Sequence, residues 1–319
     1  MITLPPPTRL EKAIQASTWA FLRLLHRFER FGLRQVFNTV LREPIAALVQ
    51  MVMNWRRHDE HFALAEERAL PEEEASNDSI IETFATYMRR AYRPGEYERG
   101  GNTKTHGIVR AEFIVRDDVP EHMRRGVFAV PGRTYRAWVR FSGPGPDMPA
   151  DIDDVGFVSC AIKLLGVPGL KLLPDDEEHT QDFISVCTPT FVTPDIHANA
   201  LLQVHVLRRT PIFYFFTTGF SHFLDFLMQG LWNETQTSPL EARYWSCTPY
   251  LLGEGQAMMY SVRPKSRKHS WIPGLPFWTS PIYLRQTMAN TLARQDVELD
   301  FMVQVQTDPH RMPIEDAGV

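Results

Sequence analysis

A regular alternation of apolar and polar side chains constrains the fold of this chain more than any other feature. In the segment 297–305, VELDFMVQV, every second residue is apolar, from Val297 to Val305. The segment YRAWVRFS at 135–142 alternates in the same way. Successive side chains of a strand point to opposite faces, so both segments predict strands with one buried face.

Further segments predict the rest of a mixed architecture. Candidate strands lie at 107–116, 157–165, 181–186 and 256–262, and candidate helices at 195–208 and 280–295, the latter started by Ser280-Pro281. Widely spaced strands with inserted helices indicate an α+β fold built on an antiparallel sheet or a closed barrel. The chain has 319 residues, 44% of them hydrophobic, which is enough for one large core or a core plus an appended helical segment.

The beginning of the chain has a different pattern. Residues 8–57 are expected to be mostly helical, because apolar residues recur near helical spacing with arginines between them. Gly32 weakens an unbroken helix, and Pro44 predicts the start of another one. After a polar linker, Ser76–Asp78 are candidate caps for a helix IIETFATYMRRAY. We therefore divide the chain into an N-terminal helical arm, 1–95, and a main domain, 96–319.

Charge is spread unevenly along the chain. Residues 1–57 contain nine Lys and Arg and three acidic residues, whereas the remainder contains 25 basic and 35 acidic residues. A nucleic-acid partner of the main domain is disfavoured, because phosphate neutralisation needs a concentrated basic surface. For the basic segment 8–57 two alternatives remain. It packs on the main domain or on a second subunit, or it lies peripherally on an anionic membrane.

The remaining compositional features concern the compartment. The three cysteines, Cys160, Cys187 and Cys247, have no paired spacing, which suits a reducing compartment. The N-terminus MITLPPPTRLEK lacks the apolar core and cleavage site of a secretory signal. The most apolar stretch, 211–232, is interrupted by His222 and Asp225 and favours a buried aromatic helix or a channel wall. We expect a cytoplasmic protein, with a peripheral position on the inner face of the membrane as the alternative.

The common enzyme motifs are missing from the sequence. It has no GxGxxG after a strand, no GxxxxGK[ST], no HExxH and no GxSxG. The eleven histidines do not fall into the spacing of a metal site. Periodicity and motifs alone therefore indicate an α+β domain without an assigned chemistry.

Three segments, taken in order, resemble the catalase superfamily. They are KTHGIVRAEFIV at 104–115, WVRFS at 138–142, and TQDF leading to TPTF at 180–191. Between them GFVSCAIKLLG resembles the family's R-G-F-A-V-K-F strand, and AMMYSVRP resembles a late strand of its barrel. The match runs from about Arg99 to Pro313, roughly two thirds of the chain.

This resemblance implies a noncovalent heme b under an antiparallel barrel, and hydrogen peroxide or an organic, including lipid, hydroperoxide as substrate. In the family a distal histidine performs acid–base work and is oriented by the serine of VRFS. The arginine of VRFS pairs with a heme propionate, an asparagine helps to hold peroxide, and a tyrosinate ligates the iron. Family members are often dimers or tetramers, so a homo-oligomer is also implied.

Some of the family's residues have counterparts in this chain. Arg140 matches the propionate arginine and Ser142 matches the serine. Where the family reads R-x-x-H-A-K, this chain has Arg99, Asn102 and Lys104 in R-x-x-N-T-K, so that Asn102 takes the place of the histidine. The resemblance thus implies Arg140 and Arg99 as cofactor-binding residues, and Ser142 and Asn102 as catalytic ones.

Other family residues are displaced or missing. His106 lies four residues after Asn102, on the same face of an extended strand, and is the candidate acid–base group. Cys187 stands where the family has its asparagine, and Phe191 ends the segment that crosses the pocket, so both are assigned to cofactor binding. No iron ligand can be assigned, because the tyrosine of the family's R-x-x-x-Y motif has no counterpart after the last strand.

Two classes of function follow from this comparison. The first, which is the function we expect, is a heme-dependent catalase, peroxidase or hydroperoxide isomerase. The second is a noncatalytic module of the same fold that binds heme or an apolar ligand, or serves as a scaffold. Asn102, Cys187 and the missing tyrosine favour the second class, and the phenylalanines of 213–226 either line an apolar access path or fill the core.

Overall fold

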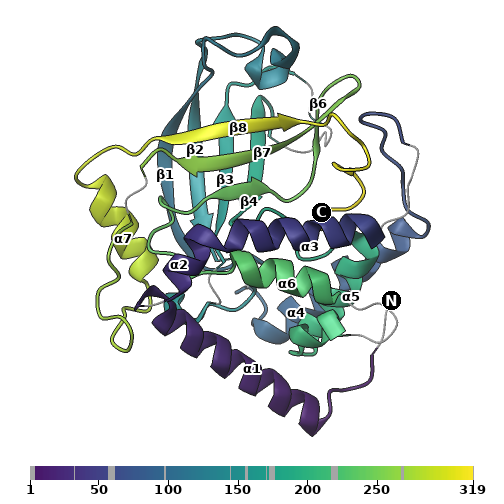
Figure 1. Ribbon diagram of the computed structural model, residues 1–319, viewed down its shortest axis with the longest axis vertical. Coiled ribbons are helices and arrows are strands. Elements are labelled where there is room, and N and C mark those ends of the chain that lie inside the picture. The colour runs from purple at the N-terminus through teal and green to yellow at the C-terminus, as the bar shows by residue number, and fades with distance from the viewer. Residues whose placement is uncertain are drawn as a thin grey trace.

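A curled antiparallel sheet of eight strands forms the main part of the computed structural model (Figure 1). The model describes residues 4–31, 33–56, 62–96, 98–143, 145–154, 157–169, 171, 177–216, 222–266 and 269–318. The strands pair in the order β1-β2-β3-β4-β5-β7, with β6 and β8 both paired to β7. They are β1 Thr105–Ile114, β2 Thr134–Ser142, β3 Ser159–Leu165, β4 Thr180–Val186, β5 Tyr244–Ser246, β6 Tyr250–Gly253, β7 Gln256–Pro264 and β8 Leu299–Val305.

The antiparallel α+β architecture expected from the sequence is confirmed. All six predicted strands are present, and the predicted burial pattern of β2 holds from Tyr135 to Phe141. The sequence prediction misses the short strands β5 and β6. Figure 1 shows β7 and β8 running across the front of β1 to β4, so that the sheet forms a half-barrel.

Aromatic side chains fill the inside of this half-barrel. Phe301 of β8 lies 4.9 Å from Phe183 of β4 and 5.2 Å from Phe113 of β1, measured between ring centroids. Tyr260 of β7 stacks on Phe301 at 5.0 Å. Rings from both sides of the curl thus meet in one core, which holds the front and back strands together.

The described residues form seven α-helices beside the sheet: α1 Arg9–Phe28, α2 Leu33–Val40, α3 Arg42–Arg56, α4 Glu73–Ala91, α5 Ile196–Leu207, α6 Phe223–Trp232 and α7 Tyr283–Leu292. Five of them, α1 and α3 to α6, lie on one side of the sheet, and α7 lies beside β1 (Figure 1). No helix of the described segments is both long and apolar enough to cross a membrane.

One predicted helix starts earlier than expected. The helix that includes IIETFATYMRRAY begins at Glu73, so Ser76–Asp78 lie inside α4 and do not cap it. Glu72 precedes the helix in a left-handed conformation, with φ 59° and no side-chain cap. The Ser76 hydroxyl hydrogen-bonds to His197 Nδ1 at 2.7 Å, which joins α4 to α5.

Polar contacts join the first helices to the main domain. Arg27 of α1 pairs with Asp153 at 2.7 Å, and Arg42 of α3 pairs with Glu234 at 3.1 Å. Apolar contacts add to these, because α3 packs against α6 through a small core that includes Met53. The position of these helices is therefore set by residues far along the chain.

Candidate functional site

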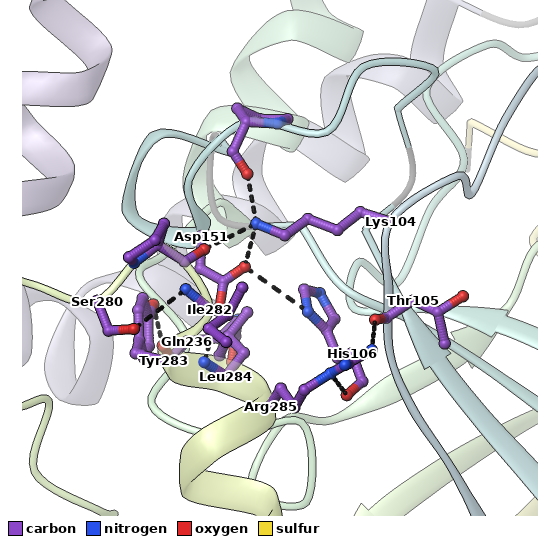
Figure 2. A network of polar contacts seen from close by, with 12 residues as sticks. Lys104, Thr105, His106, Asp151, Gln236, Ser280, Ile282, Tyr283, Leu284 and Arg285 are labelled. Carbon is purple, nitrogen blue, oxygen red and sulfur yellow. Dashed lines mark hydrogen bonds and ion pairs between the residues drawn. The ribbon is translucent and has the colours of Figure 1, made fainter.

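A buried carboxylate, Asp151, forms the centre of a polar cluster beside the start of β1 (Figure 2). Lys104 Nζ lies 2.5 Å from Asp151 Oδ1, and this side chain of Asp151 has no exposed surface. The backbone N–H of Leu284, at the start of α7, donates to Asp151 Oδ2 at 2.8 Å. Lys104 Nζ also donates to the carbonyl oxygens of Pro149 and Pro281. The cluster therefore joins β1, a short turn and α7.

The predicted acid–base residue, His106, lies next to this cluster. Its Nδ1 is 3.7 Å from Asp151 Oδ1, and its buried Nε2 has no hydrogen-bond partner among the described residues. Burial lowers the pKa of His106 to about 4, and the nearby Lys104 and Arg285 add to this effect while Asp151 opposes it. The imidazole is therefore neutral near pH 7.

The backbone around His106 differs from the expected straight strand. The pairing of β1 with β2 shifts register between Thr105 and Gly107, so His106 lies in a bulge. Asn102 precedes the strand and has a φ of 51°. The expectation that Asn102 and His106 share one face of a strand is therefore wrong.

Three of the predicted residues nevertheless form a second cluster. Arg140 Nη2 donates to the carbonyl oxygen of Asn102 at 2.6 Å and to Thr105 Oγ1 at 2.7 Å. Arg140 Nη1 donates to Ser142 Oγ at 3.1 Å, and Ser142 Oγ donates to Asn102 Oδ1 at 3.4 Å. Burial, and to a smaller degree the charge of Arg99, lowers the pKa of Arg140. Arg140 thus holds the loop before β1 against β2.

The three remaining predicted residues are Arg99, Cys187 and Phe191, and each has a structural contact of its own. The carbonyl oxygen of Arg99 accepts from Thr103 Oγ1 at 3.0 Å. The buried Cys187 Sγ accepts a hydrogen bond from the backbone N–H of Val158 at 3.0 Å. Burial raises the pKa of Cys187 to about 12, so this thiol stays protonated at neutral pH. The backbone N–H of Phe191 donates to the carbonyl oxygen of Ala317 at 2.7 Å, which joins the C-terminal segment to the loop between β4 and α5.

The described residues do not fit a heme at this place. The cavity that borders Asp151 measures about 10 Å³, close to the volume that a single water needs, about 10–15 Å³. The guanidinium of Arg140, expected to bind a propionate, already donates to three residues of its own chain. Aromatic rings fill the half-barrel, and no group of three or more His, Cys, Asp or Glu residues within the described segments could hold a metal ion.

A much larger cavity, of about 580 Å³, lies elsewhere in the structure. It is bounded by α3, α6, the outward side of β7 and β8, and the C-terminal segment; its walls include Ala47, Met228, Trp232, Trp245, Met258, Met302 and Met312. Sequence analysis misses this site, because alternation assigns the outward residues of β7 and β8 to solvent. Met259 of β7 and Met302 of β8 are apolar at outward positions, and this is the sequence signal that the outward side of these strands is covered.

The charge of the large cavity has one sign. Its charged lining residues are Arg263 on β7 and Arg311 in the C-terminal segment, and no Asp or Glu is among the described residues that line it. Neither arginine forms an ion pair with another residue of the described segments. Both are exposed, so the positive charge lies at the rim of an otherwise mainly apolar space.

Comparison with known proteins gives a likeness in fold only. No family model and no curated protein matches the sequence. The chain is structurally similar to a fungal catalase (TM-score 0.40, 15% identity, 79% of this chain and 50% of that one) and to a bacterial catalase (0.40, 18%, 78% and 48%). Catalase A from Saccharomyces cerevisiae gives a TM-score of 0.42 at 14% identity, over 80% and 52% of the two chains. The chain spans about half the length of these three proteins.

Proposed function

We propose that this protein binds an apolar molecule with one anionic group in the large cavity between α3, α6, β7 and β8. The observation that carries this proposal is the combination of a volume of about 580 Å³, mainly apolar walls and only positive charge at the rim. Sites for small organic ligands measure about 300–1,000 Å³ and are lined by apolar side chains with a few polar groups. A long-chain fatty acid has the matching chemistry.

The side chains of the cavity suit such a ligand in two ways. Five of its lining residues are methionines, whose flexible and polarisable side chains adapt to different apolar shapes. The guanidinium of Arg263 offers forked donors that match the two oxygens of a carboxylate. The ligand would therefore lie with its tail against α3 and α6 and its carboxylate toward the exposed end of β7.

Titration with oleate, followed by calorimetry, tests this proposal. The wild-type protein is expected to bind one oleate per chain. Ala47→Trp, at an exposed position of α3 that lines the cavity, is expected to weaken binding roughly tenfold or more by filling the space. Arg263→Gln is expected to weaken it about twofold to fivefold, the size of an exposed ion pair.

Arg136→Gln is the matched control, because Arg136 is an exposed arginine on β2 that does not line the cavity. Its affinity is expected to equal that of the wild type. Absence of saturable oleate binding contradicts the proposal, and so does equal affinity of Ala47→Trp and the wild type. Circular dichroism of each variant checks that the fold is retained.

Heme-dependent processing of hydroperoxides is the second candidate function, and one observation favours it. His106 is neutral and has an unpartnered Nε2, which is the state that an acid–base residue needs. The small cavity at Asp151 and the engaged donors of Arg140 oppose it.

A hemin titration of the purified chain separates the two candidates. We expect no stoichiometric Soret band in the wild type, because the described site has no room for a porphyrin. His106→Ala serves as the reference protein. A saturable band in the wild type, with peroxide turnover that His106→Ala lacks, would establish the heme enzyme instead.

A further inference from the structure

The helix α1 turns its apolar side away from the protein. Phe21, Leu24 and Leu25 are all exposed, with exposed fractions of 59%, 53% and 47%. The polar Gln15 and His26 of the same helix are buried. This arrangement is the reverse of the usual one, in which the apolar stripe of a surface helix faces the core.

Specific polar contacts fix α1 in this orientation. Gln15 Oε1 accepts from the backbone N–H of Ile212 at 3.1 Å, and His26 Nδ1 hydrogen-bonds to Thr235 Oγ1 at 3.1 Å. Arg30 Nη2 donates to the carbonyl oxygen of Thr235 at 2.8 Å. A rotation of α1 that buried Phe21, Leu24 and Leu25 would break these contacts, so the apolar side stays outward.

Two further helices also expose apolar side chains. On α3, Leu48, Met51 and Trp55 share one side and are exposed, Trp55 to 84%. On α6, Phe223 and Leu227 are exposed, whereas the polar Asp225 and Gln229 of that helix are buried. Figure 1 shows α6 between α1 and α3. Direct contacts also join α3 to α6, and the turn 211–216 to both α6 and α1.

The exposed charges on these three helices are nearly all positive. Arg9, Lys12 and Arg23 are the exposed charged residues of α1, and α3 adds Arg56 and the acidic Glu43. By helical spacing, Arg9, Lys12 and Arg23 lie on the exposed flank of α1 between the buried Gln15 and His26 and the apolar side. Basic residues flanking an apolar helix face can reach the phosphates of a lipid surface while the apolar residues enter it.

We propose that the outward side of α1, α3 and α6 binds the surface of an anionic lipid bilayer. The leucines, phenylalanines and Met51 enter the boundary between head groups and acyl chains, and the basic residues contact the lipid phosphates. Trp55 suits this boundary, where tryptophan is enriched in membrane proteins. A second copy of the chain fits less well, because a twofold contact uses the same surface on both copies and would bring the positive charges of one copy near those of the other.

Flotation of the protein with lipid vesicles tests this inference. Vesicles of phosphatidylcholine with phosphatidylglycerol are expected to carry the wild-type protein, and vesicles of phosphatidylcholine alone are expected to carry much less. The double variant Phe21→Ser/Leu25→Ser is expected to reduce binding roughly tenfold or more, because two large side chains no longer enter the lipid. Its polar contacts through Gln15 and His26 are unchanged.

A matched double variant provides the control. Ile108→Ser/Ile114→Ser removes two exposed isoleucines of β1 that lie outside the proposed surface, and it is expected to bind vesicles like the wild type. Arg9→Gln/Arg23→Gln is expected to bind several-fold more weakly and with a smaller dependence on salt.

Two results overturn the inference. The first is that the wild-type protein does not float, or floats equally with both kinds of vesicle and in all variants. The second is that sedimentation equilibrium finds a dimer that Phe21→Ser/Leu25→Ser dissociates while the wild type binds no vesicles, which would assign the surface to a second copy. Neither result depends on oleate binding, so the proposed cavity function is tested separately.

Discussion

Asp151→Ala is expected to lower the free energy of unfolding by about 3–5 kcal/mol, the usual cost of removing one partner of a buried ion pair. The substitution removes the one carboxylate with which Lys104 Nζ forms an ion pair among the described residues, and this lysine side chain is just 12% exposed. It also leaves the backbone N–H of Leu284 without its acceptor in a buried place. Urea unfolding at pH 7, followed by circular dichroism, measures the effect.

Asp153→Ala is the matched control for this prediction. Asp153 belongs to the same turn and pairs with Arg27, but both of these side chains are about one quarter exposed. Solvent screening reduces the value of such a pair to about 0–1 kcal/mol. Asp151→Asn, which can still accept from Leu284, is expected to fall between the two alanine variants. Equal losses in Asp151→Ala and Asp153→Ala would show that the buried cluster adds nothing to stability.

The strands of this fold can be predicted from the sequence because their pattern is local. Alternation over seven or more residues predicts β2 and β8, and the structure confirms both. β5 and β6 are three and four residues long, too short to show a period of two. They are defined by their pairing with β4 and β7, which a local pattern does not encode.

The candidate site shows a second limit of sequence reasoning. The alternation of YRAWVRFS predicts Arg140 and Ser142 on the same face of one strand, and in β2 they contact each other. The relation between Asn102 and His106 fails, because a bulge at the start of β1 and a left-handed residue turn the chain there. Asparagine tolerates a left-handed conformation, but its presence does not require one, and the residue type at position 106 does not encode a bulge.

The orientation of α1 shows a third limit. Periodicity predicts an amphipathic helix, but it does not say which side faces the protein. Gln15 and His26 decide this through partners 197 and 209 positions later in the chain. The exposed apolar surface on which the membrane inference rests is therefore a property of the assembled fold.

Two buried groups are expected to give opposite pH dependences that nearly cancel. His106 has a folded pKa of about 4, against an ordinary value of 6.5. The unfolded chain therefore binds a proton in this window that the folded protein does not, and stability falls as the pH falls from 6.5 to 4. Over this pH range the free energy of unfolding changes by roughly 3 kcal/mol because of His106.

Asp154 acts in the opposite direction. Burial raises its pKa from 3.8 to about 7, and Asp151 and Asp147 add to the effect while Lys104 opposes it. The folded protein keeps a proton that the unfolded chain releases, so stability falls as the pH rises from 3.8 to 7. Over this pH range the free energy of unfolding changes by roughly 4 kcal/mol because of Asp154.

Removing one of the two groups is expected to make the pH dependence of stability that the other causes measurable. Between about pH 4.5 and pH 6.5, the stability of Asp154→Asn should rise with pH, relative to the wild type, by about 1.4 kcal/mol per pH unit. Relative to the wild type, His106→Gln should lose stability with rising pH at about the same rate. Urea unfolding of the three proteins across this range measures both slopes, and groups such as His205, whose pKa burial also lowers, cancel in the comparison. Parallel curves of the free energy of unfolding against pH for all three proteins would contradict both pKa shifts. They would mean that neither group has a different pKa in the folded and unfolded states, so that His106 would not be held neutral by its burial.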